Sequence, residues 1–242
     1  MISITPVEGL PEIHEGDDLG TLIAERARLE DGDVLVVAQK VVSKAEGRIV
    51  ALEEVAASER ARALAGEWCD PRESEMILRE ATRIVRSRNA LVIAETRHGF
   101  VCASAGVDHS NAPAGALVLL PLDPDDSARR IRASVRSKTG KDVGVVVTDS
   151  FGRPFRRGTT DVAIGTAGIA PLADLRGTRD RSGSLLRSTQ VAVADEIAAA
   201  ANLVRADKAG GVPAVVVRGV THARGEGTAA ELVMPPERDL FR

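Results

Sequence analysis

The chain alternates short apolar runs with longer segments of helical composition, which is typical of mixed α/β proteins. The clearest strands are β-branched runs at 33–38, 143–147 and 214–217, which read DVLVVA, VGVVV and AVVV. Shorter segments predict further strands at 91–95, 100–103 and 161–165, the first two joined as a hairpin. The pattern has no internal repeat and predicts an α/β fold of mixed sheets with flanking helices.

Capping residues mark the start of two predicted helices. Asp70 and Pro71 supply an N-cap and a first-turn proline, and Glu73 adds a capping-box acid. The apolar face of this helix is predicted to hold Met76, Ile77, Ile84 and Val85. Asp123 and Pro124 start the second helix, which is expected to extend to Arg136.

Two more helices are predicted from composition alone. One covers 53–67, and the other begins near Ser188 or Thr189 and continues through the alanines at 198–201. The small residues of the latter would let a neighbouring element pack closely against it. No domain boundary stands out, so we expect residues 1–242 to form a single domain.

Composition and charge narrow the class of partner. The chain has 32 Lys+Arg and 35 Asp+Glu, a formal net charge of -3, and so lacks the basic field of a nucleic-acid-binding protein. Aromatic residues make up only 2% and Tyr is absent, which disfavours base stacking. Cys69, in a predicted helix, and Cys102, in a predicted strand, form no zinc motif and are expected to be buried thiols. With neither a signal peptide nor a membrane span in the sequence, we expect a cytoplasmic protein that binds small molecules.

The most informative segment is 143–165, which reads VGVVVTDSFGRPFRRGTTDVAIG. Its strand is expected to end in a turn at Gly152 and Pro154, which places Asp149 and Ser150 at the carboxyl end, where α/β proteins bind ligands. These side chains offer oxygen to Mg²⁺ or Mn²⁺, and the arginines that follow offer charge to phosphate or carboxylate groups: Arg153, Arg156 and Arg157. The alternative is a solvated turn in which Asp149 caps backbone amides.

Two further loops carry an acid after a predicted strand or helix. Asp108 lies in the loop 106–111, and Asp207 lies in the loop 205–211, which combines acid, base and glycine. A divalent cation bound with a triphosphate needs hard oxygen from several segments. The three loops therefore indicate a composite metal and phosphate site, provided that they converge.

Other catalytic motifs are missing or weak. Gly140 and Lys141 lack the remainder of a P-loop, and no GxSxG elbow accompanies Ser150 to support a hydrolase built with His109 and Asp108. An isolated GxGxxA match at 225–230 is weak evidence for a dinucleotide site. The four histidines lack zinc-hydrolase spacing: His14, His98, His109 and His222.

Ordered segments over nearly the whole chain resemble one family. They read GLPEI at 9–13, QKVVSKAEGR at 39–48, DPRESEMIL at 70–78, GVDHSN at 106–111, TDSFGRPFRRGTTDVAIG at 148–165, GTRDRSG at 177–183 and STQVAVADEIAAAANLV at 188–204. Together they resemble the coenzyme F420-0:L-glutamate ligases, also called the γ-glutamyl ligases of F420 biosynthesis. The resemblance implies GTP-dependent addition of one or more γ-linked L-glutamates to F420-0 through an acyl phosphate. It also implies an intertwined homodimer without the nitroreductase-like domain that some members carry.

The resemblance also implies roles for particular residues. Asp108 and Asp149 would be catalytic ligands of one Mg²⁺ or Mn²⁺, and Ser150 and Asp207 would bind a second, with K⁺ as a further cation. GTP contacts would fall on Leu10, Pro11, Glu12, Ile13, Gln39, Lys44, Asn111, Arg205, Ala206, Asp207, Lys208, Ala209, Gly210, Gly211 and Val212.

The sequence departs from the family pattern at two places. Arg205, Ala206 and Asp207 stand where members often have Met-Gly-Lys or Met-Gly-Gln, and Gln39 stands where relatives can have Ser. Two other functions therefore stay open. One is another metal-dependent carboxylate ligase or phosphoryl-transfer enzyme, and the other is a GTP-binding protein of the same fold without turnover.

Overall fold

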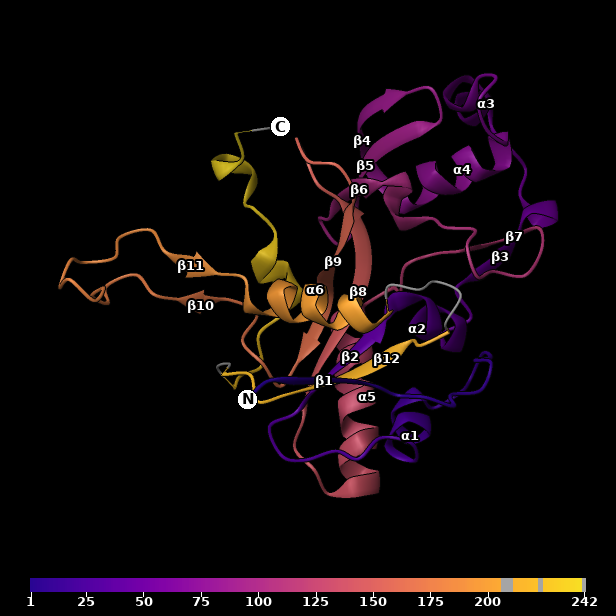
Figure 1. The fold of residues 1–242 in the computed structure, drawn as a ribbon. Coiled ribbons are helices and arrows are strands. Elements are labelled where there is room, and N and C mark those ends of the chain that lie inside the picture. Colours follow the sequence, from indigo (N-terminus) through magenta and orange to yellow (C-terminus); the bar gives the residue numbers. More distant parts are fainter. Residues whose placement is uncertain (206–210, 222–223, 241–242) are drawn as a thin grey trace.

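The computed structural model describes residues 1–205, 211–221 and 224–240, and its architecture is the predicted mixed α/β arrangement (Figure 1). At its centre lies a five-stranded sheet in the order β1-β12-β2-β8-β9. The strands are β1 (Ser3–Pro6), β2 (Val34–Ala38), β8 (Gly144–Gly152), β9 (Thr159–Ala167) and β12 (Ala214–Arg218). Only β2 and β8 pair in parallel, and the other neighbours are antiparallel.

Helices cover both faces of this sheet, which explains why its inner strands are apolar at successive positions. Leu35 and Val37 pack with α1 (Leu19–Ala24) and α5 (Pro124–Thr139), whereas Val34 and Val36 pack under α6 (Val193–Arg205). Figure 1 shows α6 crossing one face and α5 lying against the other. The two core clusters thus follow the period-two alternation of a strand.

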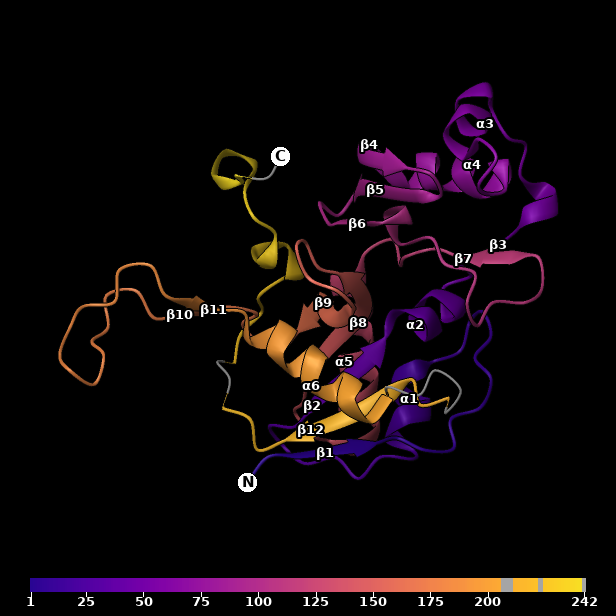
Figure 2. The ribbon, with the colours of Figure 1, turned by 45° about the horizontal axis from the view of Figure 1, so that its top comes forward.

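A second group of elements forms a smaller lobe above one edge of the sheet (Figure 2). It contains β3 (Ile49–Ala51), η1 (Leu52–Glu54), α3 (Glu59–Ala65), α4 (Pro71–Glu80), β4 (Ala81–Arg88), β5 (Leu91–Thr96), β6 (Val101–Ala103), η2 (Ser104–Gly106) and β7 (Ala116–Val118). Met76 and Ile77 of α4 pack on Val92 and Ala94 of β5 in a core separate from those of the sheet. Helix α2 (Gln39–Ala45) follows β2 and connects the central sheet to the first strand of the lobe.

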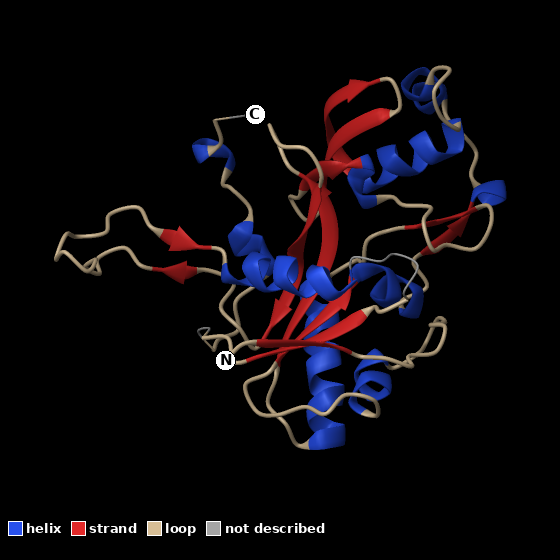
Figure 3. Cartoon of the chain, in the orientation of Figure 1, coloured by secondary structure: helices blue, strands red, loops and turns tan. Residues whose placement is uncertain are grey.

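The segment between β9 and α6 extends away from the body as a long arm. Its base is the antiparallel pair β10 (Ala173–Asp174) and β11 (Gln190–Val191), and Figure 3 shows its outer part as loop. The described residues after β12 include two short 3₁₀ helices, η3 (Ala229–Leu232) and η4 (Pro236–Arg238). In the described part of the chain, no helix has both the length and the apolar character needed to cross a bilayer.

The predicted helix starts are confirmed at two caps. Asp70 accepts from Arg72 N at 2.8 Å, and Asp123 accepts from Asp126 N at 2.9 Å. The second helix continues three residues beyond its expected end and stops at Gly140, whose φ of 71° is the left-handed conformation that glycine tolerates.

Several element boundaries were predicted wrongly. The helix of Asp70 ends at Glu80, and Ile84 and Val85 lie instead in β4, where pairing with β5 replaces helical hydrogen bonds. The expected helix at 53–67 is split, because Ser58 caps a new helix at Glu59. The last helix begins at Val193 rather than near Ser188, since Gln190–Val191 pairs with the other strand of the arm.

Two other predictions also need correction. The apolar run at 143–147 is only the first part of its strand, because β8 continues through Asp149 and Ser150 to Gly152, after which the chain turns as predicted and pairs with β9. Cys69 lies in a bend ahead of α4 and is partly exposed, whereas Cys102 is buried in β6 as expected. Burial raises the pKa of the Cys102 thiol to about 12, so it is protonated at neutral pH.

Candidate active site

A cleft of about 1080 Å³ opens where the carboxyl end of β2 and the neighbouring part of β8 meet the smaller lobe. The cleft is lined by every described residue to which the family resemblance gives a metal or GTP contact: Leu10, Pro11, Glu12, Ile13, Gln39, Lys44, Asp108, Asn111, Asp149, Ser150, Arg205, Gly211 and Val212. The predictions for Ala206, Asp207, Lys208, Ala209 and Gly210 fall outside the described residues. Segments far apart in the sequence therefore converge on one cleft.

Sheet register explains how the chain brings these groups together. Ala38 is the last residue of β2 and pairs with Thr148 of β8, so Gln39 and Asp149 follow at the same edge. The α2 helix starts at Gln39 and carries Lys40 and Lys44 along the cleft. This position agrees with the tendency of α/β proteins to bind ligands beyond the carboxyl ends of parallel strands.

Asp149 is a carboxylate in an environment that disfavours its charge. It is half-buried and accepts a hydrogen bond from Ser150 N at 2.8 Å. Burial, helped by the negative charges of Asp108 and Asp161, raises the pKa of Asp149 to about 7. Such a group is ready to lose its proton to a cation that binds beside it.

The environment of Asp108 favours its ionised form, although Asp108 lies in the same cleft. Its backbone is fixed by a bridge to Val118, with N···O distances of 3.0 and 2.7 Å. Burial alone would raise the pKa of Asp108, but hydrogen bonds from Lys40 and Ser110 outweigh it and lower that pKa below its ordinary value. Lys40 Nζ lies 2.7 Å from Asp108 Oδ2, and Ser110 N donates to Oδ1 at 2.7 Å.

Asp161 is a third carboxylate of the cleft, and the sequence pattern does not indicate it as a site residue. It lies directly across the hairpin from Ser150 and is only 4% exposed. It forms an ion pair with Arg205, and both side chains are buried. Burial lowers the pKa of Arg205, while the charges of Asp161 and Asp149 oppose that effect. The sequence indicates only that Asp161 belongs to a strand. The register of β8 on β9 places it opposite Ser150, and this register cannot be read from the sequence.

Further polar groups line the part of the cleft near α2. Lys44 Nζ lies 2.5 Å from Glu12 Oε1, whose side chain is mostly exposed. Gln39 accepts from Ser43 Oγ at 2.9 Å, and its Nε2 is buried without a hydrogen-bond partner in the described part of the chain. Asn111 has a φ of 59°, which Asn tolerates better than most residues. An unpartnered buried donor beside a cleft fits a ligand acceptor at that point.

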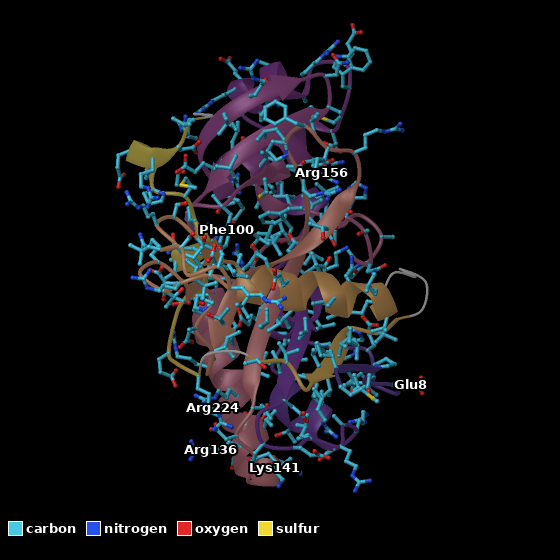
Figure 4. The ribbon with its side chains drawn as sticks, turned by 60° about the vertical axis from the view of Figure 1, so that its left-hand side comes forward. Glu8, Phe100, Arg136, Lys141, Arg156 and Arg224 are labelled. Atoms are coloured by element: carbon cyan, nitrogen blue, oxygen red, sulfur yellow. The ribbon has the colours of Figure 1, made fainter. Side chains whose placement is uncertain are left out.

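The three arginines and the histidine singled out in the sequence do not line the cleft. Arg153, Arg156 and Arg157 lie in the turn between β8 and β9, where Arg153 donates to Arg157 O at 2.9 Å. Figure 4 places Arg156 at the outer end of this hairpin. His109 is exposed and faces Glu73 at 3.9 Å, which gives no support to a Ser/His/Asp hydrolase.

The oxygen donors of the cleft suit a cation that is shared with a phosphorylated ligand. Among the described residues, no group of three or more His, Cys, Asp or Glu side chains is placed to hold a metal ion. Mg²⁺ is often bound by one or two carboxylates, with waters and substrate phosphates completing its coordination. Asp108, Asp149 and Ser150 are consistent with that smaller donor set.

Comparisons with known proteins identify relatives over the full chain. The family model described as "F420-0:Gamma-glutamyl ligase" matches residues 9–219. The "Coenzyme F420:L-glutamate ligase" of Methanopyrus kandleri is 48% identical, with 100% of this chain and 98% of the relative covered. Proteins of the same name from Methanothermobacter thermautotrophicus and Archaeoglobus fulgidus are 45% and 47% identical, again with 100% of this chain covered and with 99% and 96% of each relative.

Proposed function

The chain is an enzyme of the F420-0:γ-glutamyl ligase family, and from that premise we propose that it uses GTP to join L-glutamate to F420-0 through a γ-linkage. The observation that carries the proposal is that one cleft is lined by all the described residues to which the family resemblance gives a metal or GTP contact. Within it, Asp108 and Asp149 have pKa values shifted in opposite directions. Titratable groups with separated pKa values are characteristic of catalytic sites.

The proposed reaction activates a carboxylate before an amide bond forms. A carboxylate oxygen of F420-0 attacks the γ-phosphorus of GTP, the bond from that phosphorus to the bridging oxygen breaks, and GDP leaves. The glutamate amine then attacks the carbonyl carbon of the acyl phosphate, loses a proton and expels inorganic phosphate. Positioning and charge stabilisation supply most of the catalysis in such phosphoryl transfers.

The chemistry of the residues in the cleft suggests which of them would bind the cations and which would bind GTP. Asp108 and Asp149 would hold one Mg²⁺ or Mn²⁺, Ser150 would contribute to a second, and the bound cations would neutralise phosphate charge. Lys44 would exchange its exposed partner Glu12 for a GTP phosphate, since a lysine ammonium is a compact point charge. Gln39 Nε2 would gain an acceptor from the nucleotide. A second cation site at Ser150 and Asp207, and a bound K⁺, complete the proposed site.

Incubation of the purified chain with GTP, Mn²⁺ or Mg²⁺, L-glutamate and F420-0 tests the function. We expect the mass of F420-0 to increase by one or more glutamyl residues, with one GDP and one phosphate formed per residue added. Omission of glutamate, replacement of GTP by ATP and the Asp149→Ala variant are the controls. GTP turnover without a glutamate-dependent mass gain would indicate a different acceptor, and binding without turnover would indicate an inactive protein.

The predicted homodimer belongs to the same proposal. The arm built on β10 and β11 projects from the body of the chain (Figure 1), and Leu185 within it is 49% exposed. A second copy would bury such apolar surface. Light scattering on the purified chain would give the mass of two chains if the proposal is right and of one if it is wrong.

A further inference from the structure

Asp161 is the most buried carboxylate of the cleft, and none of the roles proposed above uses it. Its Oδ1 accepts from Ser150 Oγ at 2.6 Å, and its Oδ2 accepts from Thr148 Oγ1 at 3.2 Å. The Arg205 guanidinium donates to the same Oδ2 and, at 2.8 Å, to Thr148 Oγ1. Both carboxylate oxygens are therefore engaged by protein donors, and the residue is only 4% exposed.

The hydrogen bond to Ser150 fixes the orientation of a hydroxyl group. A serine hydroxyl has one proton and two lone pairs. Because the proton points to Asp161, the lone pairs of Ser150 Oγ are left for the cleft, into which Ser150 is exposed. The carboxylate thus fixes the acceptor side of Ser150 for a cation, as hydrogen-bonded partners do for metal ligands in general.

The Arg205 pair explains how a buried carboxylate is tolerated at this position. The side chains of Arg205 and Asp161 are 7% and 5% exposed, and a buried charge is costly unless it is paired and hydrogen-bonded. Arg205 comes from the end of α6, so the pair also ties that helix to the β8–β9 hairpin. Asp161 accordingly has a fixed position relative to Ser150.

We propose that Asp161 is a positioning residue of the ligase site, which orients the Ser150 hydroxyl so that its oxygen binds the divalent cation. The proposal rests on the function proposed above and assigns Asp161 no direct contact with cation or substrate. Its effect on the cation passes through Ser150. Loss of Asp161 should therefore weaken cation binding even where the chain stays folded.

The test is Mn²⁺ affinity, measured by calorimetry on the chain saturated with GDP. We expect Asp161→Asn to weaken Mn²⁺ binding by about 10–100-fold, the usual effect of removing a group that orients a metal ligand. Ser150→Ala should weaken it as well, and adding Asp161→Asn to Ser150→Ala should cause no further loss. Asp161→Glu retains the charge but displaces the accepting oxygen, and it should also weaken binding if the Asn variant does not fold.

The matched control is Asp33→Asn, which breaks another buried aspartate–arginine pair. Asp33 accepts from Arg218 Nε and Nη2, both at 2.8 Å, at the opposite end of β2 from the cleft. This variant should lower thermal stability and leave Mn²⁺ affinity unchanged. The inference would be overturned if both Asp161 variants bound Mn²⁺ with wild-type affinity. It would also be overturned if Asp161→Asn weakened Mn²⁺ binding as much in the Ser150→Ala background as in the wild type. Neither result would contradict the proposed ligase function. A wild-type chain that neither binds Mn²⁺ with GDP nor adds glutamate would overturn the proposed function and this inference together.

Discussion

Lys40 Nζ lies 2.7 Å from Asp108 Oδ2, and this ion pair joins the start of α2 to the segment ahead of β7. Lys40 also donates to Ser110 Oγ, which donates at 2.9 Å to the same carboxylate oxygen. Lys40 and Asp108 both line the cleft. Lys40 therefore both links these two segments and offsets negative charge where a cation is proposed to bind.

Lys40→Met should destabilise the metal-free protein by about 1 kcal/mol, because the partly exposed Asp108 carboxylate loses its charged partner but keeps its hydrogen bonds from Ser110. Mn²⁺ should recover much of that loss, since it would supply positive charge to the same carboxylate. Urea denaturation in EDTA and in Mn²⁺ measures both effects. As a control, Lys138→Met removes a solvent-exposed pair with Glu25 and should have a smaller effect on stability, with no specific recovery by Mn²⁺. Equal stability of Lys40→Met and wild type in EDTA would contradict the assigned role.

Asp149→Asn should stabilise the metal-free protein at pH 8 while abolishing ligase activity. The folded state raises the pKa of Asp149 from 3.8 to about 7, so ionisation is harder in the folded than in the unfolded chain. Stability is therefore lost as pH rises from about 4 to about 7 in the wild type. Asn has no charge to lose and can still accept from Ser150 N.

The gain at pH 8 should be on the order of 1–3 kcal/mol and should be much smaller near pH 4, where the carboxyl group is protonated in the folded state and only partly ionised in the unfolded state. Urea denaturation in EDTA at the two pH values measures it. A variant less stable than wild type at pH 8 would show that the Asp149 charge is already offset in the metal-free protein.

Mn²⁺ affinity should rise with pH and level off above about 7, because the cation must displace the proton of Asp149. The charges that face this carboxyl group are those of Asp108, Asp161, Lys40 and Arg205. Calorimetry at pH 6 in two buffers of different ionisation enthalpy should detect the release of about one proton per cation bound. Asp149→Ala should remove the release, and an unchanged proton count in that variant would assign it to another group.

The central sheet follows from the sequence because local and long-range forces agree there. Residues 33–38 and 143–147 are apolar at nearly every position, and both faces of these strands are indeed covered. The caps at Asp70 and Asp123 are local interactions and were predicted as such. By contrast, β4 owes its conformation to pairing with β5, and adjacent Ile84 and Val85 fit either element.

Part of the site was also accessible before the fold was known. Asp149 and Ser150 come directly after a recognisable buried run of apolar residues. Lys44 and Asn111 were indicated only by the family resemblance, because lysine and asparagine are common on protein surfaces. Lys40 was missed because its partner lies 68 residues away in sequence. Its pairing, like that of Asp161, depends on long-range register, which sequence pattern does not specify.

Gly165→Ala tests whether close contact between α5 and β9 holds the sheet in place behind the cleft. A Cβ added at Gly165 would lie 2.2 Å from the carbonyl oxygen of Pro124, a backbone atom that cannot rotate away. We expect a loss of about 1–3 kcal/mol in the free energy of unfolding, the usual cost of overpacking. Gly152→Ala is the control, because its Cβ would meet no atom within 4 Å, and its effect should stay within about 0.5 kcal/mol. Urea denaturation compares the two, and equal stabilities would mean that α5 shifts at little cost.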